Sequence, residues 1–238
     1  MDNAWGMPIH ADTAPSWLLT GWVRACHAEG ATVSDAALLA TAHDLLVLWD
    51  DPSRKYHCIT HLIDVLRRVD ELAQEAHDAN AVRLAAWYHG AVFTADSVSA
   101  YENRAGENSA ASANLAREQL AALGVPGANI ERVAELVHAV HQQAGGAGPK
   151  DSDANVLLDA DLAVLAESPQ RYRAYMTAIR DEYCDIPEDD YITTRLRILE
   201  KIQGRKRIFL SPGAAAWEKQ ARENLEAEIV RLRAKLKK

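Results

Sequence analysis

Two histidines and an aspartate stand at helical spacing near the start of an amphipathic segment. His57 and His61 are four residues apart, and Asp64 follows three residues later. Residues three or four apart share one face of an α-helix, so we predict that these side chains line one face. Imidazoles and a carboxylate placed in this way are a typical set of ligands for a divalent metal ion.

The same segment has a simpler interpretation. Leu62, Val65, Leu66 and Val69 form an adjoining apolar face, which predicts a helix packed into a core. Histidines on such a helix are commonly hydrogen-bonded or half-exposed without any metal. The histidine spacing alone therefore leaves the metal site open.

Other polar residues lie in apolar surroundings further along the chain. His89 ends the almost wholly apolar segment 81–90, and Asp159 and Asp161 interrupt the apolar run 156–165. Charged carboxylates are costly to bury unless they are paired or bind a metal. An equal alternative is that one aspartate caps a helix and the other points outward.

Composition favours a compact protein without nucleic-acid partners. The chain has 238 residues, of which 48% are hydrophobic, and a net charge of −8. These values predict one domain over 1–238, and the acidic balance gives no support for binding nucleic acid. The three scattered cysteines, Cys26, Cys58 and Cys184, predict reduced thiols. No secretory signal or membrane span is recognisable, so we expect a soluble, cytoplasmic protein without a membrane partner.

The pattern of apolar residues and helix breakers predicts an all-α fold. Ser34 is a predicted N-cap, the loop 93–106 is long enough to suggest function, and no strand pattern is visible. We expect N-terminal helices within 13–49, a core over about 50–204 and a C-terminal helix at 214–236. The expected helices are 16–28, 35–49, 57–77, 81–90, 107–123, 129–141, 169–184, 189–202 and 214–236, with 156–165 as a further apolar run and a glycine loop at 145–149.

Four short motifs resemble those of the HD-domain superfamily of metal-dependent phosphohydrolases, and more narrowly one bacterial branch of it. They occur in order and are RKYHCITH at 54–61, WYHGAVF at 87–93, ENSA at 107–110 and LDADL at 158–162. The resemblance covers the chain from about residue 50 to the C-terminal helix. It implies an HD-domain-like helical bundle.

The resemblance assigns roles to five residues. His61, His89 and Asp161 match metal ligands of the family, and His57 matches a histidine that gives a proton to the leaving oxygen. Asp64 matches a carboxylate that typically holds a ligand histidine in place. Cys58 stands where related sites usually have asparagine.

Gly90 departs from the pattern. It occupies the position of the aspartate that names the family, normally a ligand. The three remaining ligands could hold one metal with open positions, as catalytic zinc sites do, or could bind it too weakly. Glu107 and Asp159 are candidate replacements, although a carboxylate such as Glu107 is also favoured at a helix N-terminus. His138 and His141 are expected to face solvent.

The resemblance implies a metal-dependent phosphohydrolase that acts on a small phosphate ester, with a nucleotide as one candidate. The expected cofactor is a divalent transition metal, namely Mn²⁺, Fe²⁺, Co²⁺, Ni²⁺ or Zn²⁺. Arg54, Arg180 and Arg195 are candidate phosphate clamps, with surface salt bridges as the alternative. A degenerate domain that binds a nucleotide or a protein without catalysis is the second hypothesis, and an iron oxygenase is the third.

Overall fold

The chain folds almost entirely into helices. The structure, a computed structural model, describes residues 9–102, 105–142 and 151–237. Within them the all-α prediction is confirmed, with eleven α-helices, four short 3-10 helices and one two-stranded ribbon. The α-helices are α1 (Ser16–Ala28), α2 (Asp35–Trp49), α3 (Ile59–Glu71), α4 (Ala79–Tyr88), α5 (Ser97–Tyr101), α6 (Ser109–Ala122), α7 (Gly127–Gln142), α8 (Ser152–Leu162), α9 (Pro169–Glu182), α10 (Glu188–Gln203) and α11 (Glu218–Lys235).

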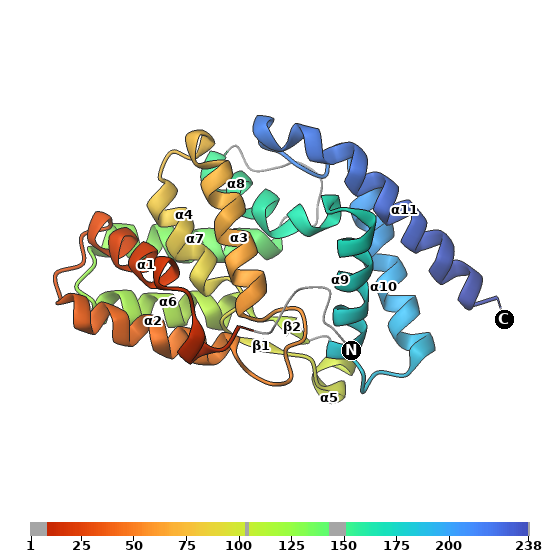
Figure 1. The fold of residues 1–238 in the computed structure, drawn as a ribbon, viewed down its shortest axis with the longest axis horizontal. Coiled ribbons are helices and arrows are strands. Elements are labelled where there is room, and N and C mark those ends of the chain that lie inside the picture. Colours follow the sequence, from red (N-terminus) through yellow and green to blue (C-terminus); the bar gives the residue numbers. More distant parts are fainter. Residues whose placement is uncertain (1–8, 103–104, 143–150, 238) are drawn as a thin grey trace.

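Figure 1 shows α1, α2 and α6 on one side of the molecule and α9, α10 and α11 on the other, with α3 and α4 between them. The 3-10 helices are η1 (Ala11–Thr13), η2 (Ala73–Glu75), η3 (Ala163–Ala166) and η4 (Pro212–Trp217). One cluster of buried apolar side chains extends from Leu18 on α1 to Leu232 on α11.

Helices with clear local signals begin and end where the sequence predicts. The bounds of α1 and α2 agree with the expected ranges, and the Ser34 hydroxyl accepts a hydrogen bond from the Ala37 amide at 3.4 Å. Such a serine satisfies an amide that the first helical turn leaves without a partner.

The apolar segment around α4 forms the centre of the core. All residues of α4 from Ala81 to Tyr88 except Arg83 are buried, as expected for a helix that is apolar on nearly every side. The Trp49 ring is also fully buried, and its Nε1 donates to the Trp87 carbonyl at 3.0 Å. This bond fixes the end of α2 against the end of α4.

The predicted histidine helix is shorter than expected. Helix α3 begins at Ile59, two residues after His57, and Cys58 is its N-cap with an extended backbone at φ −113° and ψ −175°. The prediction that His57 shares a helical face with His61 and Asp64 is therefore wrong. The physical reason is that the amides of residues 55–57 donate to the Glu182 carboxylate, which holds this stretch as a turn.

The loop 93–106 contains more regular structure than its sequence indicates. Strands β1 (Phe93–Thr94) and β2 (Gly106–Glu107) pair antiparallel, with Phe93 opposite Glu107. The expected absence of strands is wrong here, because two-residue strands are too short to show an alternating pattern. Helix α6 begins at Ser109 after the cap Asn108, so Glu107 does not head a helix as expected.

A buried ion pair joins the three C-terminal helices. Arg195 on α10 donates through Nε to Glu228 on α11 at 2.9 Å, and the Tyr172 hydroxyl on α9 donates to the same carboxylate at 2.6 Å. The Arg195 and Glu228 side chains are 9% and 2% exposed, so this network is shielded from water. It sets how α9 and α10 lie against α11.

The three cysteines Cys26, Cys58 and Cys184 are free thiols, as predicted. Among the described residues, no helix combines the length and the apolar character needed to cross a membrane.

Replacing Glu228 with alanine should lower the free energy of unfolding by about 3–5 kcal/mol, because the Arg195 guanidinium would stay buried without its counter-ion. Urea denaturation measures the change. Glu223→Ala on the same helix is the matched control, since the Glu223 side chain is 57% exposed and should cost less than about 0.5 kcal/mol. Equal losses in the two variants would contradict the role given to Glu228.

Candidate metal centre

The donor atoms of His61, His89 and Glu107 all lie within 4.8 Å of one another, and Asp161 approaches both imidazoles from a fourth element. The Nε2 atoms of His61 and His89 are 3.4 Å apart, and Asp161 Oδ1 lies 3.3 Å from the first and 3.8 Å from the second. Glu107 Oε1 lies 3.8 Å from His89 Nε2. Ligands bound at about 2.0–2.1 Å around a tetrahedral metal stand about 3.3–3.4 Å apart. The residues therefore fit a divalent ion with little movement.

Each donor comes from the end of its element. His61 is in the first turn of α3, His89 follows the last residue of α4, Glu107 lies on β2 and Asp161 is near the end of α8. The side chains of His89 and His61 are 0% and 3% exposed, that of Glu107 is 9% and that of Asp161 is 20% exposed. The centre thus lies at the edge of the core, with its most accessible side at Asp161.

The protonation state of His89 suits a ligand. Its Nδ1 lies 2.7 Å from the Ala86 carbonyl, which can only accept, so Nδ1 carries the proton and Nε2 presents a lone pair to the centre. Burial lowers the pKa of His89 despite the nearby carboxylates Glu107 and Asp161. The imidazole is therefore neutral, as metal binding requires.

The Asp161 carboxyl is poised to be ionised. Burial alone would raise its pKa, but the hydrogen bond with His61 is the main opposing cause, and the pKa is lowered overall. The neighbouring negative charge of Glu107 raises the pKa of Asp161. Two carboxylates that approach the same pair of imidazoles and repel each other favour a cation among them.

Glu107 occupies the space beside Gly90. A Cβ atom on Gly90 would stand 2.7 Å from Glu107 Oε1 and 2.6 Å from Cη2 of the Trp49 ring. The chain therefore has no room for an aspartate at position 90 in this arrangement. A carboxylate from β2 reaches the place that a side chain at position 90 would enter.

His57 lies next to the centre without being part of it. Its ring centroid is 5.5 Å from that of His61, and its Nδ1 pairs with Glu182 Oε1 at 2.5 Å. Burial lowers the pKa of His57, but the Glu182 carboxylate more than compensates, and the pKa is raised overall. This pairing keeps a proton on the imidazole toward neutral pH.

Sequence reasoning missed Glu182. It lies 125 residues from His57, and its other oxygen accepts the amides of Lys55, Tyr56 and His57 at 2.9–3.0 Å. A signal was present, because Tyr175, Ile179 and Glu182 recur at helical spacing along the buried face of α9. A carboxylate on an otherwise apolar face requires a buried partner.

Asp159 and Asp64 have other partners than the centre. The buried Asp159 carboxylate accepts the amides of Leu210 and Ser211 at 2.6–2.9 Å, so it stabilises the turn before η4 and is not a replacement ligand. Asp64 forms ion pairs with Arg67 and Arg171 at 3.7 and 3.5 Å. Within the described residues it has no hydrogen bond to His61, so its expected role in holding a ligand histidine is not supported.

His138 on α7 is half-buried rather than solvent-facing. The side chain of His141 and the glycine loop 145–149 lie outside the described residues.

The three candidate phosphate clamps are engaged in internal bonds. Arg54 donates to the carbonyls of Gly90 and Ala91 at 2.7 and 2.8 Å. Arg180 donates to two backbone carbonyls near the end of α9, and Arg195 pairs with Glu228. Among the described contacts none of the three forms the expected surface salt bridge, and only Arg54 holds the chain next to the centre.

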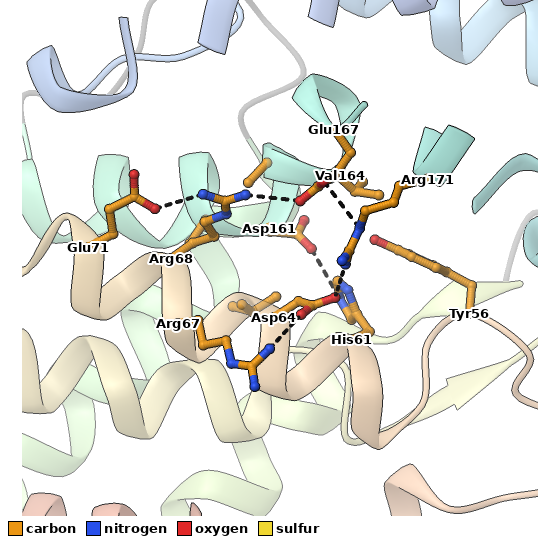
Figure 2. A pocket seen from close by; sticks show the side chains of 13 residues that line it. Tyr56, His61, Asp64, Arg67, Arg68, Glu71, Asp161, Val164, Glu167 and Arg171 are labelled. Carbon is orange, nitrogen blue, oxygen red and sulfur yellow. Dashed lines mark hydrogen bonds and ion pairs between the residues drawn. The ribbon is translucent and has the colours of Figure 1, made fainter. Parts of the chain in front are cut away.

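A cavity of about 220 Å³ adjoins the centre on the Asp161 side. His61 and Asp161 form part of its wall, and Figure 2 shows the guanidinium groups of Arg67, Arg68 and Arg171 grouped around them. Their acidic partners in the cavity wall are Asp64, Glu71 and Glu167. The cavity therefore offers several directed N–H donors within a nearly balanced set of charges.

Comparison of the chain with protein-family models, with curated proteins and with solved structures gives no significant match. The function has to be inferred from the residues and their geometry.

Replacing Gly90 with alanine should lower the free energy of unfolding by about 1–3 kcal/mol, because the added methyl group would overlap the buried Trp49 ring. Chemical denaturation measures the change. Gly21→Ala in α1 is the matched control, since a Cβ there meets nothing within 4 Å and should stabilise the helix by about 0.5–1 kcal/mol. Similar effects of the two substitutions would argue against the tight contact at Gly90.

Proposed function

We propose that this protein is a metal-dependent phosphohydrolase of HD-domain-like architecture that acts on a small phosphate ester. The observation that carries the proposal is that the donor atoms of His61, His89 and Glu107 lie within 4.8 Å of one another, with Asp161 Oδ1 3.3 and 3.8 Å from the two imidazoles. Three of these residues are those that the motif resemblance assigns as ligands. The HD-like core of about residues 50–204 is part of the same proposal.

Glu107 completes the ligand set in this proposal. In the family pattern the residue after the second histidine is an aspartate, and here Glu107 approaches the same place from β2. Two imidazoles and two carboxylates suit Mn²⁺, Fe²⁺, Co²⁺, Ni²⁺ or Zn²⁺. A metal held there would supply Lewis acidity toward the phosphoryl oxygen and toward the attacking water.

His57 acts as the general acid. The Glu182 carboxylate keeps its imidazole protonated and fixes the ring through Nδ1, so Nε2 is the atom that gives up a proton. Water forms the new bond to phosphorus while the bond from phosphorus to the alcohol oxygen breaks. The His57 proton passes to that oxygen, and a proton released by the water restores the imidazolium.

The cavity lined by Arg67, Arg68 and Arg171, which we call the arginine cavity, gives phosphate a route to the centre. Arg68 and Arg171 both pair with Glu167, which holds their planar guanidinium groups beside Asp161 (Figure 2). Guanidinium groups held in this way match the geometry of phosphate oxygens.

A degenerate domain that binds a small molecule or a protein without catalysis is the second candidate. Gly90 favours it, because the chain lacks the carboxylate that the family pattern has at this position. Retention of a metal separates the two candidates.

The purified chain should retain about one divalent metal ion after incubation with Mn²⁺, Fe²⁺ or Zn²⁺ and desalting, as measured by elemental analysis. His61→Ala should lose both the metal and phosphate-ester turnover, and Glu107→Gln should weaken metal retention at least about tenfold. A His61→Ala protein that keeps both the metal and the turnover would contradict the assignment of His61 as a metal ligand.

Asp64→Asn is the matched control for these variants. Asp64 lies one turn from His61, but its carboxylate pairs with arginines. This variant should bind the metal like the unmodified chain. Loss of metal from it as complete as from Glu107→Gln would remove the distinction between the two carboxylates.

Replacing Glu182 with glutamine should lower the pKa of His57, because the negative charge that raises it is removed. Since the reaction needs protonated His57, kcat/KM falls as the pH rises through this pKa. The falling limb of the profile should therefore move to lower pH in Glu182→Gln. Nuclear magnetic resonance titration of the His57 ring checks the shift without turnover, and an unchanged midpoint would contradict the pairing.

A further inference from the structure

A second, larger cavity opens beside His57. Its volume is about 440 Å³, within the range of small-molecule sites. Four tyrosine rings line it, together with three isoleucines: Tyr101 from α5, Tyr175 from α9, Tyr183 from the turn after it and Tyr191 from α10. We call this space the tyrosine cavity.

The tyrosine cavity differs in chemistry from the arginine cavity. Its only guanidinium among the described residues is that of Arg195, which is buried against Glu228. Its carboxylate is that of Asp190, which accepts the Tyr101 hydroxyl at 2.6 Å. Arg195 is already neutralised by Glu228, and the exposed Asp190 carboxylate adds a negative charge, so the cavity disfavours a phosphate group, and its tyrosine rings suit an uncharged group with aromatic faces.

The Tyr56 ring contacts residues that line both cavities. The Tyr56 ring centroid is 4.9 Å from that of His57, 4.8 Å from that of His61 and 4.7 Å from that of Tyr175. His61 lines the arginine cavity, whereas His57 lines the tyrosine cavity. The candidate ligands and the candidate proton donor therefore face different spaces.

This division has a chemical meaning in a hydrolysis reaction. The general acid must stand next to the oxygen that leaves phosphorus. The alcohol attached to that oxygen then extends toward His57, which lines the tyrosine cavity. The rest of the phosphate stays on the side of His61 and Asp161.

We propose that the tyrosine cavity receives the leaving alcohol of the substrate, and that this alcohol carries an uncharged aromatic ring. The inference rests on the proposed function, because it uses His57 as the proton donor. Stacking and edge contacts with the tyrosines should favour an aromatic alcohol over an aliphatic one by about tenfold in kcat/KM.

The test compares the hydrolysis of benzyl phosphate and butyl phosphate by the metal-loaded full chain. The two leaving alcohols have similar acidity, so a difference in rate reports on binding rather than on intrinsic reactivity. We expect kcat/KM to be at least about tenfold higher for benzyl phosphate. Equal values for the two esters would overturn the inference while leaving the proposed function intact.

A substitution that fills the tyrosine cavity tests whether the leaving alcohol binds there. Thr194 is exposed and lines the tyrosine cavity from α10, so Thr194→Trp should fold normally and remove the preference for benzyl phosphate. Arg197→Trp is the matched control, since Arg197 is exposed on the same helix and does not line the cavity. It should keep the preference, and loss of the preference in both variants or in neither would overturn the inference.

A binding measurement separates the inference from catalysis. Benzylphosphonate cannot be hydrolysed at its carbon–phosphorus bond, and calorimetry should show it binding at least about tenfold more tightly than methylphosphonate. If neither ester is hydrolysed, the proposed function fails. Tighter binding of benzylphosphonate that Thr194→Trp abolishes would still support the cavity assignment, and its absence would overturn it.

Discussion

The arrangement of this protein depends on the cost of keeping carboxylates out of water. Glu107 and Asp161 lie beside two buried imidazoles, and the negative charge of Glu107 makes Asp161 harder to keep ionised. Neutral His89 cannot balance them, because its pKa is lowered by burial. A cation bound among the donor atoms would resolve this conflict, so the electrostatics of this part of the fold favour the proposed metal site.

The surrounding core keeps these donors in place. Arg54 lies over the rings of Trp49 and Phe93 and donates to the carbonyls that follow His89. Trp49 in turn is bonded to the end of α4. These contacts fix the chain where α4 stops and β1 begins, and the hydrogen bond from His89 Nδ1 to the Ala86 carbonyl sets the direction of the ring within this packing. Side chains that stabilise the fold, such as Arg54 and Trp49, thus surround the candidate metal ligands.

The sequence predicts this protein well where the signals are local. The bounds of α1 and α2 follow from caps and apolar spacing, and His61, His89 and Asp161 attract notice as polar residues in apolar segments. Contacts distant in sequence decide the rest. The start of α3 depends on Glu182, which is 125 residues from His57. Likewise, Asp159 and Asp161 look equivalent in the sequence. They differ in the structure because the Leu210 amide, which is distant in the sequence, bonds to Asp159.

The ribbon of β1 and β2 is the smallest element of the fold, and several parts of the site depend on it (Figure 1). It places Glu107 at the centre, and opposite Glu107 it places Phe93, whose ring lies 4.8 Å from that of His57. Tyr101, on α5 between the two strands, lines the tyrosine cavity. A shift of the pairing by one residue would turn Glu107 to the other face of the ribbon. The Glu107 carboxylate, the Phe93 ring beside His57 and the wall of the tyrosine cavity would then move together, so the alignment of four residues joins the candidate metal centre to the neighbouring cavity.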